Sequence, residues 1–431
     1  MTYRDSITEQ RIVAIVATLD TKGLEAEFLR GRFHDQGYAA RLVDVGVAGA
    51  PQCTIRDGDA AAADVTEAAG TSLAAVRTAR RDHAMAAMGR GAGEVLRRWA
   101  AGGRLVGAIG LGGNQGTAIA CSALRSLPLG LPKVMVSTVA SGNIRPYIGA
   151  SDIAMVFSLG DLLGGPNRIT RRVLAQAAGM LHGMILASAA MAGTVAVGAA
   201  LLPERPAVAL TALGNTHAAA ARIMASLDAR GFEVVPFHAS GAGGAAMERL
   251  IEGGIFAGVV DLTTHELLGE ICTDDIYAPA EGERLVAAGR RGVPQVVAPG
   301  GLDYFIFGPP ESVPPRFRDR PTHHHNPYNL NVLANADERA QAGRLLAERL
   351  NVARGPVAVL YPLRGWSHIG RPGGVMWDPT GAEAFRRSLQ AALTDRVRYH
   401  EVDANINDAV FADEVVRVFL DLAAVKTSGT T

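Results

Sequence analysis

The sequence predicts an α/β protein built from two Rossmann-like, doubly wound domains with mainly parallel sheets and a ligand crevice between them. Short β-branched runs alternate with longer Ala- and Leu-rich helical patterns, which is typical of βαβ units. The chain has 431 residues. A domain typically has about 150 residues, so the chain is expected to form more than one domain. Pro203 and Pro206 interrupt both periodicities near the middle, and the two halves repeat one order of elements.

This boundary divides the chain into an N-terminal nucleotide-binding domain, residues 1–203, and a C-terminal domain, residues 204–431. The internal repeat supports the division. Asp35-Gln-Gly-Tyr38 and Arg230-Gly-Phe232 each lead from a helix into a strand, and the strand before each helix ends in a threonine.

In the N-terminal half, apolar β-branched runs predict strands, and amphipathic Ala-rich stretches predict helices. The strands are expected at Ile12–Ala17, Ala40–Val45, Leu105–Gly110, Lys133–Ser137 and Ile153–Phe157, and the helices at Gly23–Gln36, Leu73–Ala100, Thr117–Leu127 and Arg168–Ala190. The charge-free segment Met184–Leu202 is long enough to span a membrane. Because it consists mostly of Ala, Gly, Ser and Thr, we interpret it as a buried helix end that runs into an extended linker.

The C-terminal half repeats the alternation. Its strands are expected at Ala207–Thr211, Glu233–Phe237, Gly258–Asp261, Gln295–Ala298, Val357–Leu360 and Val397–Val402, and its helices at Thr216–Ala229, Ala245–Ile251, Gly282–Arg290, Asp337–Leu350, Gly381–Leu393 and Asp408–Ala423. Residues 299–335 are rich in Pro, His and Asn. Long irregular segments in compact domains are usually functional, so we expect an ordered, His-rich loop there.

Composition argues against several classes of protein. Lys+Arg and Asp+Glu balance at 42 each without a long basic stretch, so there is no electrostatic case for nucleic acid. Cys53, Cys121 and Cys272 stand far apart without metal-type spacing, which indicates reduced thiols. The first ten residues are polar and lack the apolar core of a signal peptide. We therefore expect a cytoplasmic protein that binds neither nucleic acid nor membranes.

The sharpest motif is the glycine-rich loop Gly110-Leu-Gly-Gly-Asn-Gln-Gly-Thr117, which follows an apolar strand and opens a helix. Glycines let backbone N–H groups approach an anion, and a helix N-terminus adds a favourable dipole. The loop is neither a Walker A motif nor a strict dinucleotide fingerprint. The alternative is a tight turn without a ligand. The expected phosphate contacts are Gly112, Gly113, Asn114, Gln115, Gly116 and Thr117.

Two other polar motifs follow strands of the same half. Thr18-Leu-Asp-Thr-Lys22 ends the first strand, where open α/β sheets bind ligands. Asp20 suits a ribose hydroxyl or a metal and Lys22 suits phosphate, whereas a helix N-cap at Asp20 or Thr21 is the structural alternative. After the fourth strand, hydroxyls and a glycine suit phosphate or carboxylate, with capping again as the alternative. The candidates there are Ser137, Thr138, Ser141 and Gly142.

The C-terminal half offers a parallel set. A second glycine-rich turn follows His238, and Asp261-Leu-Thr-Thr-His-Glu266 closes the next strand. If residues 323–325 are extended, His323 and His325 share one face and suit a metal or a substrate. Candidate catalytic groups are His238, His265, Glu266 and His325, and candidate substrate contacts are Ser240, Gly241, Gly243, Gly244, Thr263, Thr264, His323, Asn326 and Arg371.

In chain order these motifs resemble those of the ATP-binding family typified by the tomato mosaic virus resistance protein. The resemblance covers nearly the whole chain. It continues through Asn167-Arg-Ile169, Pro299-Gly-Gly-Leu-Asp303, His325-Asn-Pro327, Pro362-Leu-Arg-Gly365 and Ile406-Asn-Asp408. It implies two Rossmann-like domains, with ATP bound in the first. It also implies a separate TIM-barrel protein as a partner, because bacterial members are often fused to one or encoded beside one.

Two departures from the family pattern bear on the ligand. Asn114 and Gln115 replace the usual Ser and Gly of the loop, and His265 stands where a threonine is usual. These changes indicate a specialised substrate.

Three functions follow from these motifs. The first is an ATP-dependent enzyme that acts on a small anionic metabolite in the crevice between the domains, with a divalent metal as a further candidate. The second is a nucleotide-gated module that binds another protein without turnover. The third, a two-lobed sugar- or amino-acid-binding protein, is opposed by the lack of a signal peptide. The Ala- and Gly-rich composition leads us to expect a homo-oligomer.

Overall fold

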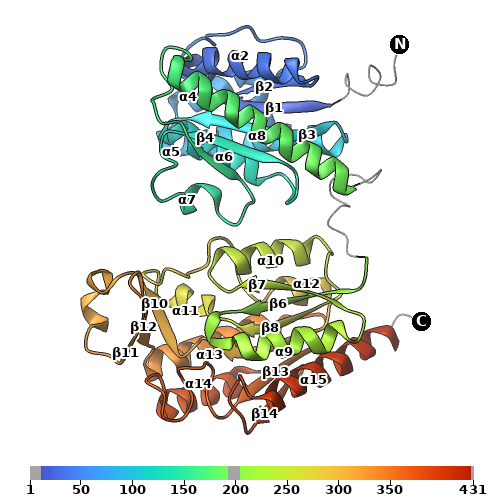
Figure 1. Ribbon diagram of the computed structural model, residues 1–431, viewed down its shortest axis with the longest axis vertical. Coiled ribbons are helices and arrows are strands. Elements are labelled where there is room, and N and C mark those ends of the chain that lie inside the picture. The colour runs from blue at the N-terminus through green and yellow to red at the C-terminus, as the bar shows by residue number, and fades with distance from the viewer. Residues whose placement is uncertain (1–10, 193–203, 429–431) are drawn as a thin grey trace. The chain divides into compact units, whose positions relative to one another are not determined.

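The computed structural model describes residues 11–192 and 204–428 (Figure 1). The chain divides into two compact units, Met1–Leu202 and Pro203–Thr431. We call them unit 1 and unit 2 and describe each by itself.

Unit 1 contains one parallel five-stranded sheet in the order β2-β1-β3-β4-β5. The chain passes from β1 to β2 on one side and then returns to β3 on the other. The strand order therefore reverses between β1 and β3, which is where open α/β sheets bind ligands. The strands are β1 (Ile12–Ala17), β2 (Ala39–Asp44), β3 (Leu105–Gly112), β4 (Lys133–Ser137) and β5 (Ala154–Phe157).

Helices cover both faces of this sheet (Figure 1). Alternate residues of β1 point to opposite faces. Val16 packs into one core with α3, α5 and α6, whereas Ile15 packs into the other with α2 and α8. The helices are α2 (Leu19–Asp35), α3 (Ala62–Ala68), α4 (Leu73–Thr78), α5 (Arg81–Ala101), α6 (Asn114–Arg125), α7 (Arg145–Ile148) and α8 (Arg168–Ala192).

The helix expected at Leu73–Ala100 is two helices. Ala79 and Arg80 have extended backbones, with ψ angles of 160° and 145°, and this corner turns α4 away from α5. The sequence does not reveal the break because neither residue is a Gly or Pro. Helices α2 and α6 each begin several residues earlier than expected, so the Thr18–Lys22 motif and the glycine-rich loop both run into a first helical turn.

The end of α8 is not buried, contrary to expectation. Its apolar stripe lies in the core as far as Ile185, but Leu186 and Met191 are 51% and 87% exposed. Beyond Ile185, the described residues of α8 are exposed or only partly buried. The linker predicted after them lies outside the described residues. By length and composition alone, α8 is the one described helix that could cross a membrane, which is weak support for a span.

Unit 2 contains a parallel six-stranded sheet in the order β14-β13-β9-β8-β6-β7, which reverses between β6 and β8. Two parallel sheets flanked by helices confirm the predicted fold class (Figure 1). The strands are β6 (Ala207–Ala212), β7 (Glu233–His238), β8 (Gly258–Thr263), β9 (Gln295–Gly300), β13 (Val357–Pro362) and β14 (Val397–Val402). The helices are α9 (His217–Asp228), α10 (Ala242–Glu252), α11 (Glu266–Ile271), α12 (Ala287–Arg291), α13 (Ala336–Asn351), α14 (Pro379–Ala392) and α15 (Ala409–Ser428).

The predicted His-rich loop 299–335 is instead mostly structured. It contains a three-stranded antiparallel sheet of β10 (Tyr304–Phe307), β12 (Asn329–Leu333) and β11 (Thr322–Asn326), in that order. The loop prediction was wrong because it rested on the Pro, His and Asn residues of this segment, whereas the apolar residues between them form strands. Phe305, Phe307, Leu330 and Val332 are buried in a core shared with α11 and α13, and this burial stabilises the small sheet.

Candidate functional site

A cavity of about 580 Å³ lies in unit 1 at the carboxyl ends of β1 and β3, where the strand order reverses. We call it the unit 1 cavity. Its volume falls within the range of small-molecule sites, about 300–1,000 Å³. Two motifs far apart in the sequence meet there because parallel strands end at the same edge. The predicted residues that line it are Thr18, Asp20, Thr21, Lys22, Gly113, Asn114, Gln115 and Gly116.

One wall of the unit 1 cavity is the uncapped N-terminus of α6. Gly113 is the N-cap residue and offers no side-chain cap, and the first intrahelical bond runs from Thr117 N to Gly113 O at 2.7 Å. The N–H groups of residues 114–116 precede that bond, so they are available to an anion. A Cβ atom on Gly112 would lie 2.7 Å from the Gly116 Cα atom. The loop can therefore approach the helix only with glycine at residue 112.

Three cations and one carboxylate line the unit 1 cavity. The cations are Lys22, Arg77 and Arg81, and the carboxylate is Asp20. Asp20 Oδ2 accepts hydrogen bonds from the N–H groups of Ala48 at 2.9 Å and residue 49 at 3.2 Å, which fixes the carboxylate against the loop after β2. The excess of positive charge favours an anionic ligand.

The remaining wall is apolar. It contains Val45, Val47, Val76, Met85, Met88 and Ile119. Apolar side chains beside a few convergent polar groups are typical of sites that bind a flat organic ring.

The hydroxyls of Thr117 and Ser137 are already used within the protein. Both residues are fully buried, and their oxygens lie 2.7 Å apart, which ties β4 to the start of α6. The residues that line the unit 1 cavity, as the described chain defines it, do not include Gly112, Thr138, Ser141 or Gly142.

In unit 2, the predicted second anion cradle holds a carboxylate of the chain itself. Glu266 Oε1 accepts a hydrogen bond from Gly241 N at 3.3 Å, at the N-terminus of α10. A Cβ atom on Gly244 would clash with this carboxylate, and one on Gly243 would clash with the carbonyl of His238. These glycines therefore let α10 pack closely, and Glu266 takes the position expected for a ligand.

Glu266 also belongs to a buried ionic cluster around Arg284. The guanidinium pairs with Glu248, with Asp261 at 2.8 Å and with Glu266 at 3.5 Å. Burial alone lowers the pKa of Arg284, but these three carboxylates outweigh it and raise the pKa. Burial raises the pKa of Glu248 against the attraction of Arg284. One cation thus neutralises part of the charge of three carboxylates.

His265 is fully buried, and both of its ring nitrogens are hydrogen-bonded. Nδ1 lies 2.7 Å from the Gly301 carbonyl oxygen and Nε2 lies 3.0 Å from Asp275 Oδ2. Both partners accept, so the ring holds both protons as an imidazolium. Burial lowers the pKa of His265, but Asp275 and the carbonyl outweigh that effect and raise it. With neither nitrogen free, His265 supports the fold and cannot accept a substrate proton in this arrangement.

Asp275→Asn is expected to destabilise unit 2 by about 3 kcal/mol at pH 6, because it breaks a buried ion pair. The folded-state pKa of His265 is raised, so the ion pair contributes fully below the unfolded histidine pKa of about 6.5. The contribution decreases as pH rises through the folded pKa. Urea unfolding of both proteins at pH 6 and pH 9 measures this, and a constant or growing difference contradicts it. Asp274→Asn, at an exposed surface pair, is the control, with an effect of about 0.5 kcal/mol.

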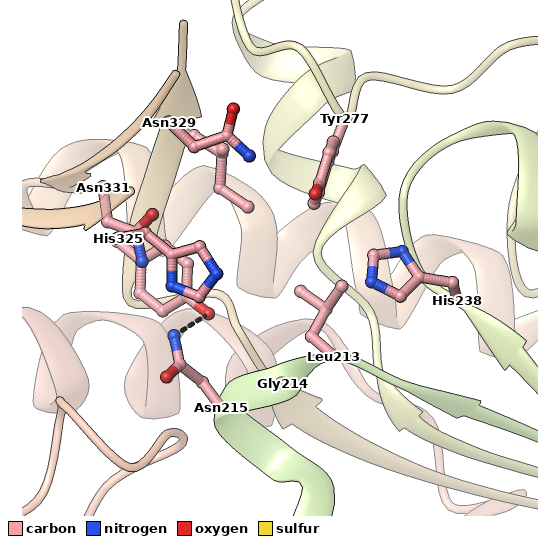
Figure 2. A pocket seen from close by; sticks show the side chains of 10 residues that line it. Leu213, Gly214, Asn215, His238, Tyr277, His325, Asn329 and Asn331 are labelled. Atoms are coloured by element: carbon pink, nitrogen blue, oxygen red, sulfur yellow. Dashed lines mark hydrogen bonds between the residues drawn. The ribbon is translucent and has the colours of Figure 1, made fainter. Parts of the chain in front are cut away.

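A second cavity, of about 50 Å³, lies in unit 2 beside the carboxyl ends of β6 and β7 (Figure 2). We call it the unit 2 cavity. The small antiparallel sheet forms one side, and His238 and His325 face it from opposite sides (Figure 2). Burial lowers the pKa of His238 against the attraction of Glu266, which favours a neutral imidazole. Its lining residues are Leu213, Gly214, Asn215, His238, Tyr277, Tyr304, Ile306, His325, Asn329 and Asn331.

The other predicted residues of unit 2 do not line this cavity. Thr263 Oγ1 lies 2.8 Å from the hydroxyl of Thr216, and Thr264 Oγ1 donates to the Ala298 carbonyl oxygen at 3.2 Å. Ser240, His323, Asn326 and Arg371 also lie outside the lining. Within residues 11–192 and 204–428, no group of three or more His, Cys, Asp or Glu side chains is arranged to hold a metal ion.

Family models match both units. Residues 11–190 match the N-terminal domain, and residues 205–423 the C-terminal domain, of an uncharacterised protein family, UPF0261. The chain belongs to the UPF0261 family. The UPF0261 proteins of Clostridium tetani and Rhizobium meliloti are 35% and 36% identical to it, each over 95% of this chain and over 98% and 99% of their own lengths.

The resemblance to the tomato resistance protein is also confirmed. The ToMV resistance protein Tm-1(GCR237) of Solanum lycopersicum is 35% identical over 321 residues, which are 74% of this UPF0261 chain and 42% of that protein. Among solved structures, the glycosyltransferase SnogD of Streptomyces nogalater aligns over 95% of this chain and 99% of its own. The TM-score of 0.21 and the 13% identity support no inference.

Several groups that line the two cavities of this UPF0261 chain were not predicted from the sequence to be site residues. In unit 1 they are Arg77, Arg81 and the apolar wall, part of which α4 and α5 bring to the sheet. In unit 2 they include the asparagines of β12, the turn after β6, and Tyr277 and Tyr304. The run Arg77-Thr-Ala-Arg-Arg81 was the only local signal, and its meaning depends on how α5 packs.

Proposed function

We propose that the unit 1 cavity binds a nucleoside triphosphate, with ATP as the first choice. One observation carries the proposal: an uncapped helix N-terminus and three cations share a cavity of about 580 Å³ with an apolar wall. Phosphates need the first two features, and an aromatic base needs the third.

Each group of the cavity has a role in this proposal. The N–H groups of residues 114–116, together with Lys22 and Arg81, would hold the phosphates. Val76, Met88 and Ile119 would pack against the base. Asp20 is the carboxylate that could contact a ribose hydroxyl or a magnesium ion brought by the triphosphate.

Calorimetric titration of the full chain with ATP, ADP and NAD tests the proposal. We expect ATP to bind with a Kd of about 1 µM to 100 µM. Lys22→Ala and Arg81→Ala should each weaken binding by roughly tenfold or more, since each removes a charge-assisted contact. Arg80→Ala is the matched control, because Arg80 is exposed, pairs with Asp82 and does not line the cavity. Absence of binding by all three nucleotides would overturn the proposal.

We propose further that bound ATP serves a reaction, because the unit 2 cavity brings together the imidazoles of His238 and His325, and histidine is the residue type that most often acts as a general acid or base in catalysis. The test is ATP consumption by the full chain with a pooled library of small metabolites, for wild type and His238→Ala. Consumption that the variant loses supports an enzyme. ATP binding without consumption in any pool would instead identify a nucleotide-gated binding module.

A further inference from the structure

The unit 2 cavity is polar but holds no fully charged side chain. The described residues that line it include no Asp, Glu, Lys or Arg. Their polar groups are imidazoles, amides and phenols, which donate and accept hydrogen bonds without a fixed charge.

Asn331 presents its side-chain amide to the cavity. The residue is only 3% exposed, and no hydrogen bond joins this amide to another described residue, but the amide is open to the cavity and not sealed in the core. It lies on β12 between Leu330 and Val332, whose side chains point into the core on the opposite face of the strand. The ladder pairs Asn331 with Ile306 on one side and His323 on the other, so its position is fixed. An amide that faces a cavity without a protein partner is available to hydrogen-bond a small molecule there.

Other groups that line the cavity are held by contacts within the protein. Asn215 Nδ2 donates to the Tyr304 hydroxyl at 2.9 Å (Figure 2), so the phenolic proton is free to be donated to a ligand. The backbone carbonyl of Asn215 accepts from His368 N and from Asn407 Nδ2, each at 2.9 Å. The ring of Tyr277 meets His238 edge-on, with centroids 5.6 Å apart. These contacts position the lining before a ligand arrives.

We propose that the unit 2 cavity binds a small uncharged molecule that carries hydroxyl and carbonyl groups, on the scale of a three-carbon hydroxycarbonyl compound. A volume of about 50 Å³ corresponds to roughly four water-sized groups. An amide donates to a carbonyl and accepts from a hydroxyl, and a neutral imidazole does the same. A carboxylate or an ammonium group would find no opposite charge on the lining. This ligand differs from the anionic metabolite expected from the sequence.

The inference does not depend on nucleotide binding in unit 1, so it is tested on the full chain without ATP. Saturation-transfer NMR at neutral pH compares dihydroxyacetone and glycerol with glycerate, a three-carbon anion with one more oxygen. We expect dihydroxyacetone to bind at least about tenfold more tightly than glycerate, because only the anion loses its hydration without a counter-charge.

Two variants and one control locate the binding. Asn331→Leu keeps the volume but removes the amide, and His325→Ala removes an exposed imidazole, so each should weaken binding by about tenfold or more. His324→Ala is the matched control, since its side chain alternates to the other face of β11 and does not line the cavity. If Asn331→Leu fails to fold, His325→Ala still decides. A preference for glycerate, no binding tighter than about 10 mM, or wild-type binding by His325→Ala would each overturn the inference.

Discussion

Arg284→Met is expected to unfold unit 2 at neutral pH. Arg284 is 1% exposed and is the cation that faces the buried carboxylates of Glu248, Asp261 and Glu266. Breaking one buried ion pair costs about 3–5 kcal/mol, and three carboxylates lose their partner here, so we expect at least about 5 kcal/mol. That is comparable to the whole stability of many domains, about 5–15 kcal/mol. Amide hydrogen exchange, read separately for peptides of unit 1 and unit 2, would show protection lost in unit 2.

The pH dependence and a control sharpen this test. Without the guanidinium, the buried carboxylates should bind protons more tightly, so the destabilisation should be smaller at pH 5 than at pH 8. Arg290→Met removes an exposed arginine of α12 that pairs at the surface with Glu252, and it should cost less than about 1 kcal/mol. If the Arg284→Met variant is as stable as the wild type at pH 8, the ion pairs of Arg284 do not stabilise unit 2 and the prediction is wrong.

Gly113→Asp is expected to reduce ATP affinity by at least about 100-fold without reducing stability. Gly113 is the N-cap of α6, with φ −77° and ψ −162°, a conformation open to any residue. Its Cβ atom would meet only Thr138 Oγ1, at 3.7 Å. Aspartate is a better N-cap than glycine by a few tenths of a kcal/mol, so α6 should not be weakened. The new carboxylate would take the place proposed for a phosphate and would repel it.

The measurement pairs calorimetry with thermal unfolding. Gly113→Asn supplies a neutral cap of the same shape, and we expect it to keep ATP affinity within about tenfold of wild type. If Gly113→Asp binds ATP as the wild type does, the phosphates do not lie at the N-terminus of α6. If Gly113→Asp unfolds at a lower temperature than the wild type, residue 113 has a structural role at the start of α6 beyond that of an N-cap.

Much of the fold could be predicted because strands leave a local signal. The apolar runs at Ile12–Ala17 and Lys133–Ser137 are strands with the expected limits, and the alternation of strands and helices is enough to predict parallel sheets. The same topology explains why Thr18–Lys22 and the glycine-rich loop meet at one cavity. Carboxyl ends of parallel strands share an edge, whatever their separation along the chain.

The rest depended on tertiary contacts that no local pattern carries. Arg81 lines the unit 1 cavity because the chain turns between α4 and α5, at residues that favour helix. His265 was predicted to be an acid–base group, but its Nε2 is hydrogen-bonded to Asp275, which lies in an irregular turn and also accepts a hydrogen bond from Ile306 N. Glu266 looked like a catalytic carboxylate, and it belongs to the cluster of Arg284 instead. Residue type predicted polarity at each position but not the partner.

The carboxylate of Glu266 at the start of α10 has a consequence for competition by free anions. This carboxylate is covalently part of the chain, so a free anion could bind at this helix N-terminus only by displacing it, and the displacement would also break its contact with Arg284. The N-terminus of α6 in unit 1 has no side-chain cap, so its N–H groups are open to an anion from solution. The two glycine-rich turns therefore differ in how they respond to their surroundings: the one in unit 2 is permanently self-liganded, and the one in unit 1 is not.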